Sequence, residues 1–387
     1  MTNLSEIKIS AVTPSDQEAE LYAAYGENKL FLCKADSLSA TEIAALPNIQ
    51  AIAHGIGDGR LEDKEIEISI YYHHPYICVA ERFGVNAALV NLQTRAVRAL
   101  QREDYHCDVS SYSIGFLERD GRTLLICQTQ WNRLDILDAE TGENLTEREV
   151  YCRDTGRKQE NGNPLFEYKN YLDYFHSLLL VAPDGKHFLS NGWVWQPFDR
   201  ILIFQTDKFF TSFEVECIVA NTYPSGYNWD RPYTFIDNNV FAVAVDDARK
   251  ADELDEDEKK TYEYKQLVFF NLTDKYQESA YGYRWIEPYK QVFCTVFPTN
   301  NYGEVKGKLY YDEVSGNLVA LTPSGAYAIN LNGEILAHLP EIVFTDVQSH
   351  GDFGSQYGQQ IGWDYSPKHH VFYTWQSGIG VVEQKLD

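Results

Sequence analysis

Basic residues are scarce in this sequence relative to acidic ones. Across 387 residues there are 33 Lys and Arg against 57 Asp and Glu, which gives a formal net charge of −24. A surface of this sign repels phosphate backbones and anionic lipid headgroups, and it attracts basic proteins. We therefore expect no nucleic-acid partner and no membrane partner. The charge favours a basic protein partner, although it also serves solubility alone.

Long apolar runs and paired cysteines are missing as well. No stretch approaches the roughly 18 apolar residues that a membrane-spanning helix needs, and no apolar segment follows a basic N-terminal region. The seven cysteines are scattered and include no CxxC pair. An odd, dispersed set is typical of reduced thiols in a protein core. The sequence thus predicts a soluble, cytoplasmic protein without disulfides.

Motifs for catalysis and for metal binding are also absent from the sequence. It contains no GxSxG, no phosphate-binding glycine-rich loop that opens a helix, and no HExxH. The acidic stretch 248–265 lacks the central glycine and the alternating ligands of a calcium loop. We expect no catalytic residue, no metal ligand and no cofactor, and enzymatic activity is not the leading interpretation.

Aromatic residues, in contrast, are abundant, and β-branched residues gather in short runs that are typical of strands. Seven strand–turn–strand units recur, with Gly, Asn, Asp, Pro or Ser in turns that suit tight hairpins. The units are LYAAYGENKLFLCK, ISIYYHHPYICVAE, YSIGFLERDGRTLLICQ, SLLLVAPDGKHFLSNG, YTFIDNNVFAVAV, KLYYDEVSGNLVALT and IGWDYSPKHHVFYTW.

A second recurring element, an apolar strand that ends in a polar turn, follows most of these hairpins. Examples are LDILDAETGENL, RILIFQTDKFF and QLVFFNLTDKY. Together they predict one four-stranded unit per repeat. The first unit is irregular, because SLSATEIAALPNIQAIA has a helix-like start. The last unit lacks room for a fourth strand, and we expect the N-terminal strand EIKISAV to supply it and close the ring.

These units resemble the blades of β-propellers of the WD40 and quinoprotein-like superfamily. The turns in PDGKHFL and RDGRTLLI resemble the first-hairpin turn of such blades, and LDILDAETGENL resembles their third-to-fourth strand turn. The resemblance implies an all-β repeat protein: a seven-bladed β-propeller of four-stranded antiparallel blades, with residues 1–387 in a single domain. Two stacked sheets are the structural alternative. The paired Gly-His and Trp-Asp signature of WD40 repeats is missing, so the resemblance names no specific family.

The long segments between predicted strands all fall on one face of such a ring. They include QTQWNR and NGWVWQPFDR as well as 151–174, 221–233, 246–265 and 344–360, whereas the turns on the opposite face are short. Binding sites tend to lie on loops that a rigid scaffold holds. We therefore expect the functional surface on this face.

Aromatic and charged residues on these loops are the candidate binding residues. Aromatic rings beside a charged pair suit a protein hot spot, a sugar or a peptide. The structural alternative is that the tryptophans fill gaps between blades and that an Asp–Arg pair pins a loop. The candidates are Trp131, Trp193, Trp195, Tyr227, Trp229, Asp230, Arg231 and Tyr233.

The leading hypothesis is a non-enzymatic scaffold that binds a protein partner through this face. The alternative is a carbohydrate-active or small-molecule enzyme with its site in the central funnel. A deep pocket lined by carboxylates and tryptophans favours the alternative, and a shallow apolar funnel counts against it. Asp173 and His176 are close in sequence, but in an extended strand they point to opposite faces, so we expect a structural role for them.

Overall fold

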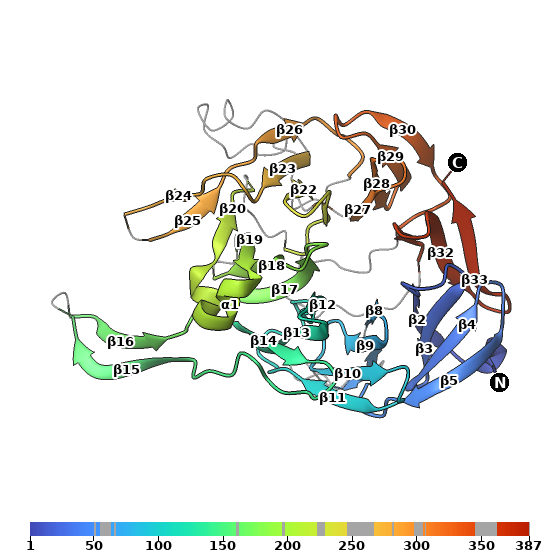
Figure 1. Ribbon diagram of the computed structural model, residues 1–387, viewed down its shortest axis with the longest axis horizontal. Helices are drawn as coiled ribbons and strands as arrows, with labels where there is room; N and C mark the ends of the chain where they lie inside the picture. The colour runs from blue at the N-terminus through green and yellow to red at the C-terminus, as the bar shows by residue number, and fades with distance from the viewer. Residues whose placement is uncertain are drawn as a thin grey trace.

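The computed structural model describes residues 1–387 except 50–51, 55–62, 66, 160–161, 196–197, 223–228, 246–266, 281, 298–304, 306, 345–361 and 387. Seven sheets built on antiparallel strands stand around a ring in this part of the chain (Figure 1). The prediction of a seven-bladed propeller is confirmed. The candidate Tyr227, the loop 246–265 and all of the loop 344–360 except its first residue lie outside the described residues.

The sheets follow one another in chain order. The first three contain β1 (Thr2–Asn3), β2 (Ile9–Pro14), β3 (Leu21–Gly26), β4 (Lys29–Lys34) and β5 (Ser39–Ala45); β8 (Ile68–His73), β9 (Tyr76–Glu81), β10 (Asn86–Asn91) and β11 (Val97–Gln101); and β12 (Ile114–Arg119), β13 (Arg122–Gln130) and β14 (Arg133–Asp138). The fourth contains β17 (Phe175–Val181), β18 (His187–Val194), β19 (Phe198–Gln205) and β20 (Ile218–Ala220), extended by β25 (Arg284–Ile286) and β24 (Gln277–Glu278).

The last three sheets complete the ring. They contain β21 (Tyr233–Phe235), β22 (Val240–Ala244), β23 (Leu267–Asn271) and β26 (Lys290–Val292); β27 (Lys308–Asp312), β28 (Asn317–Thr322), β29 (Gly325–Ile329) and β30 (Ile335–Leu339); and β31 (Asp364–Ser366), β32 (Val371–Gln376) and β33 (Gly380–Lys385). A separate two-stranded sheet pairs β6 (Ile52–His54) with β7 (Asp63–Glu65).

Several of the predicted hairpins have turn residues that tolerate positive φ. Asp120 and Gly121, between β12 and β13, have φ of 52° and 71°, and Glu27 and Asn28, between β3 and β4, have φ of 48° and 61°. Two consecutive residues of this kind give a turn whose twist matches that of the flanking strands.

The core lies between neighbouring sheets. All six residues of β9 are buried, and Ile77 and Val79 of that strand pack in one cluster with Tyr25 and Ile43 of the first sheet. A blade that is covered on both faces needs apolar residues in near-continuous runs, which explains the apolar stretches of the sequence. Each fully buried Val, Leu or Ile side chain contributes about 1.5–3 kcal/mol.

Closure of the ring differs from the prediction. The N-terminal strand β2 pairs with β3 in the first sheet, and the last sheet has three strands, β31 to β33. The first sheet is also a complete blade, because the segment with the helix-like start forms β5, which pairs with β4 and β1. The first and last sheets instead join through the Asp36 amide, which donates to the Val381 carbonyl at 2.9 Å, and through Tyr22 and Glu383.

Two further elements depart from the expected strands and loops. Within the predicted loop 151–174, β15 (Tyr151–Lys158) and β16 (Pro164–Lys169) form a two-stranded sheet, here called the arm, which projects from the ring (Figure 1). After β19 the chain forms α1 (Thr206–Ser212) and a short 3₁₀ helix (Phe213–Glu216) where the sequence predicts a polar turn. Among the described residues, the helices are too short and too polar to cross a membrane.

Candidate functional site

Aromatic side chains from five segments meet on one side of the third and fourth sheets. Phe175, at the start of β17, stacks on Trp193 of β18 with centroids 3.7 Å apart and planes 3° apart. The ring centroids of Trp131 and Phe175 are 4.4 Å apart, and those of Trp229 and Trp193 are 5.4 Å apart. With them, Tyr105, His106 and Trp195 complete what we call the aromatic cluster. Four predicted candidates, Trp131, Trp193, Trp195 and Trp229, are therefore brought together.

Buried members form the floor of this cluster. Trp193 is 3% exposed and donates its indole N–H to Ser110 Oγ at 2.9 Å, and Trp229 is 8% exposed and donates to the Val109 carbonyl at 2.7 Å. Gly192 allows the close approach, since a Cβ there would stand 1.9 Å from the Phe175 carbonyl oxygen. The floor is thus hydrogen-bonded and fixed by packing.

Exposed members form the rim of the cluster. Trp195 and Tyr105 are each 47% exposed. Trp195 stands edge-on to Trp193, with planes at 88°, and Tyr105 contacts Trp131 and Phe175. Trp193 and Trp195 are two positions apart and both contact Phe175, so the two rings lie on one side of the sheet and differ in burial. Two large aromatic side chains therefore face solvent on a rigid floor.

Acidic residues flank the segments that carry the exposed rings. Asp104, Asp108 and Asp173 flank the cluster in sequence, and no Lys or Arg among the described residues forms an ion pair with them. Glu103 accepts a hydrogen bond from the Gln130 amide at 3.1 Å. Partial burial raises the pKa of Asp173. The edge of the cluster is negative.

The other described candidates of the YNWDRPY loop, Asp230, Arg231 and Tyr233, lie outside the aromatic cluster. Arg231 is 0% exposed and donates from Nε to Asp199 Oδ2 at 2.7 Å. Tyr233 is buried and donates its hydroxyl to the Leu178 carbonyl at 2.7 Å. Asp230 accepts from Ser111 Oγ at 2.5 Å. Arg231 is therefore a latch, as the structural alternative proposes, but its partner is Asp199 of β19 rather than the adjacent Asp230.

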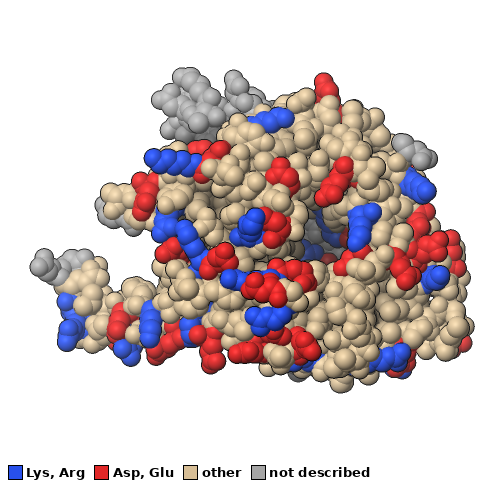
Figure 2. Space-filling view, in the orientation of Figure 1, with Lys and Arg blue, Asp and Glu red and all other residues tan. Residues whose placement is uncertain are grey.

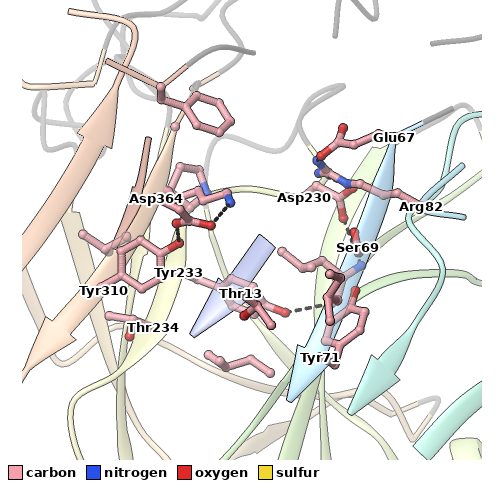
Figure 3. A pocket seen from close by; sticks show the side chains of 18 of the residues that line it. Thr13, Glu67, Ser69, Tyr71, Arg82, Asp230, Tyr233, Thr234, Tyr310 and Asp364 are labelled. Atoms are coloured by element: carbon pink, nitrogen blue, oxygen red, sulfur yellow. Dashed lines mark hydrogen bonds and ion pairs between the residues drawn. The ribbon is translucent and has the colours of Figure 1, made fainter. Parts of the chain in front are cut away.

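A cavity of about 350 Å³ lies where the first strands of the sheets converge (Figure 3). In Figure 2, basic and acidic side chains are interspersed around a hollow near the centre of the ring. The charged residues that line the cavity are Glu67, Arg82, Asp230, Arg231, Lys308 and Asp364. No tryptophan lines it among the described residues.

Sequence reasoning missed most of these cavity residues. Lys308 and Asp364 each begin the first strand of a blade, and Glu67 immediately precedes one. Several repeats have a charged residue at the start of the first strand. This pattern could have identified the cavity residues, because the first strands of the blades converge on the axis of a propeller.

Asp173 and His176 do not form an acid–base pair. His176 is 0% exposed, with Nδ1 3.0 Å from Ser190 Oγ, whereas Asp173 is exposed. Burial lowers the pKa of His176 to about 3, so the imidazole is neutral. Within the described ranges, no three His, Cys, Asp or Glu side chains gather as a metal site would require.

Comparisons with known proteins concern the fold. A scan of protein-family models found no match, and a search of curated proteins found none either. A chain in the crystal structure of a mitotic checkpoint complex is similar at 10% identity and a TM-score of 0.50, over 98% of this chain and 92% of that one. BamB from Moraxella catarrhalis is similar at 12% identity and a TM-score of 0.45, over 97% of this chain and 85% of that one. The Pan2 WD40 domain from Neurospora crassa is similar at 8% identity and a TM-score of 0.45, over 95% of this chain and 86% of that one.

These identities are low enough that the likeness concerns the fold alone. The propeller fold that the resemblance in the sequence implies is confirmed at that level. The chain is a seven-bladed β-propeller.

Proposed function

We propose that this propeller is a non-enzymatic scaffold that binds a protein partner through the aromatic cluster. The observation that carries the proposal is the pair of exposed rings, Tyr105 and Trp195, on a floor of buried aromatic side chains. Rings that packing already holds in place lose little conformational entropy when a partner covers them. Buried aromatic anchors of this kind dominate the energetics of protein interfaces.

The arm extends the same surface. Phe166 and Tyr168 of β16 are 41% and 60% exposed and share one face of the arm, with ring centroids 6.4 Å apart. The ring centroids of Tyr168 and Tyr171 are 5.7 Å apart, and those of Tyr171 and Trp131 are 6.1 Å apart. Ring contacts therefore connect the arm to the aromatic cluster. Exposed apolar side chains that form a contiguous patch are typical of interaction sites.

The acidic rim supports a basic partner. Asp104, Asp108 and Asp173 carry no ion pair with Lys or Arg among the described residues, and the whole chain has a net charge of −24. Complementary charge at the edge of an interface accelerates encounter and is screened by salt. The similar chain of the mitotic checkpoint complex is, by its description, itself part of a protein assembly.

Replacing Tyr105 and Trp195 together with Ala tests the proposal. The native partner is captured from cell extract, purified, and titrated against wild type and the variant by calorimetry at low and moderate salt. Loss of two hot-spot rings is expected to weaken binding by at least about 30-fold. The thermal midpoint should shift by less than about 2 °C, because exposed side chains contribute little to stability.

A matched control replaces two equally exposed aromatic residues of another sheet region, Tyr289 and Phe293, which are 52% and 53% exposed. This variant should bind like wild type. Equal binding by all three proteins, or equal loss in both variants, contradicts the proposed site. A partner that is not basic, or binding that salt does not weaken, contradicts the role of the acidic rim.

A further inference from the structure

The central cavity is separate from the aromatic cluster and has a chemistry of its own. Most of its lining comes from the first strands β2, β8, β17, β21, β27 and β31, and segments next to the strands add further residues, among them Arg82. Its volume of about 350 Å³ is at the lower end of the range of about 300–1,000 Å³ that ligand pockets occupy. The space suits a single small molecule. Figure 3 shows polar side chains facing it from two opposite sides.

One side is built around Asp364. Lys308 Nζ lies 2.6 Å from Asp364 Oδ2, and the Tyr310 hydroxyl donates to Asp364 Oδ1. The Lys308 side chain is 39% exposed and the Asp364 side chain 24% exposed, so both are accessible from the cavity. An ammonium group has three N–H donors, and the pair with Asp364 uses one of them.

The other side is built around Arg82. Its Nη1 lies 2.8 Å from Glu67 Oε1, its Nε donates to Ser111 Oγ at 2.9 Å, and its Nη2 lies 3.7 Å from Asp230 Oδ2. Glu67 is 32% exposed and is therefore the accessible carboxylate on this side. Each charge that faces the cavity thus already has an opposite charge beside it.

This pairing determines the kind of ligand that fits. A ligand with a net charge would compete with one member of a pair and leave the other unpaired in a partly buried site, which is costly. A neutral hydroxyl can donate to a carboxylate lone pair and accept from an ammonium without breaking the pair. Tyr71 and Tyr233, with Ile70 and Leu180, supply apolar walls for C–H groups.

We propose that the central cavity binds a neutral polyhydroxylated small molecule, a monosaccharide or cyclic polyol, whose hydroxyl groups bridge the Lys308–Asp364 pair and the Arg82–Glu67 pair. The inference is independent of the protein-binding function, because it uses no residue of the aromatic cluster. It concerns binding alone and assigns no reaction.

Calorimetric titration with four probes tests the class of ligand. D-Glucose and myo-inositol are neutral, glucose 6-phosphate is anionic and glucosamine is cationic. At least one neutral probe should bind saturably, and each charged probe should bind at least about tenfold more weakly than that probe. Failure of both neutral probes to bind, or tighter binding of either charged probe, overturns the proposal.

A double variant, Lys308→Met with Asp364→Asn, tests the location. Because both charges are removed together, neither remains unpaired, and the bound probe should lose at least about tenfold in affinity. The matched control is Lys29→Met with Glu42→Gln, a pair at 2.9 Å on β4 and β5 whose side chains are 44% and 38% exposed. It should bind like wild type, and equal affinity in all three proteins overturns the site.

Ser69→Leu provides a second test that does not depend on the folding of the double variant. Ser69 lines the cavity on the side of Arg82, so a larger apolar side chain there takes up part of the space. The thermal midpoint is measured in parallel. A folded Ser69→Leu protein with unchanged affinity contradicts a ligand in this cavity, and loss of binding supports it.

Discussion

At the residue scale, buried polar side chains hold the loops that carry the site. The Arg231 guanidinium, 0% exposed, pairs with Asp199, 1% exposed, and so ties the segment before β21 to β19. The segment that this pair anchors also contains Trp229, which belongs to the floor of the aromatic cluster. A charge pair in the core therefore positions a ring beneath the exposed rim.

Replacing one member of this pair should be far more damaging than replacing both. Arg231→Met leaves the Asp199 carboxylate buried without its guanidinium, which is expected to lower the free energy of unfolding by about 3–5 kcal/mol. In the double variant Arg231→Met with Asp199→Leu most of that loss should be recovered. Urea unfolding followed by tryptophan fluorescence measures both. A single variant within about 0.5 kcal/mol of wild type would show that the pair is not a latch.

The sequence predicts some side-chain positions and misses others for a physical reason. The separation of the buried His176 from the exposed Asp173 is predicted, because strand alternation is a local rule. The partner of Arg231 is not local, since Asp199 lies 32 positions away and the neighbouring Asp230 is the more obvious choice. Pairing across elements depends on tertiary packing, which spacing does not encode.

At the element scale, the arm is unusual because no other described segment covers it. All residues of β15 and β16 except Tyr151 are exposed. A two-stranded hairpin alone is marginally stable in water. Its cross-strand contacts, such as Arg153 with Glu167 at 2.8 Å, lie on the surface, where solvent and salt screen them. The arm is thus better suited to contact a partner than to stabilise the ring.

Replacing residues 152–168 with a short Gly-Ser-Gly linker should leave the ring intact. The thermal midpoint is expected within about 2 °C of wild type, because the segment buries little surface, while binding of the protein partner should weaken. Calorimetry measures both quantities. A finer version replaces Phe166 and Tyr168 with Ser on one face of the arm, and Arg153 and Glu167 with Gln on the other. Only the first pair should weaken binding, so equal effects would contradict a binding face on the arm.

Sequence reasoning finds the blade hairpins but not the arm. Several blade turns can be recognised from residues such as Asp120 and Gly121, which readily adopt the positive φ values observed there. In the arm, the register shifts between Asp154 and Arg157, and the alternation of apolar and polar residues is lost. The sequence does not predict the helix α1, because its seven residues, TDKFFTS, are equally compatible with a turn.

At the scale of the whole molecule, the ring closes by contacts between the first and last sheets rather than by a shared strand. Val381 of β33 is 0% exposed, and its carbonyl accepts from the Asp36 amide of the first sheet. Gly380 approaches the Ser37 backbone so closely that a Cβ would stand 2.7 Å from its carbonyl oxygen. The sequence predicts the number of blades because hairpins with similar turn residues recur along the chain. It does not predict how the ring closes, because closure depends on which sheet the N-terminal strand joins.

Removal of residues 380–387 should open the ring. The last sheet would lose β33 and the contact with the first sheet, and the free energy of unfolding should fall by more than about 3 kcal/mol, the contribution of one large buried side chain. Urea unfolding measures the fall, and the arm deletion, which removes a longer but exposed segment, is the control. A truncated protein as stable as the full chain would show that the ring does not depend on this junction.

The arm also carries Cys152, the exposed member of the seven cysteines. Burial raises the pKa of Cys33 and Cys107 to about 11 and that of Cys217 to about 12, which keeps these thiols protonated and slow to react. A maleimide fluorophore should therefore attach first to the arm of the unmodified sequence. A change in the intensity or polarisation of its fluorescence would then report partner binding to the arm. Cys152 therefore serves as a natural labelling site for a binding assay.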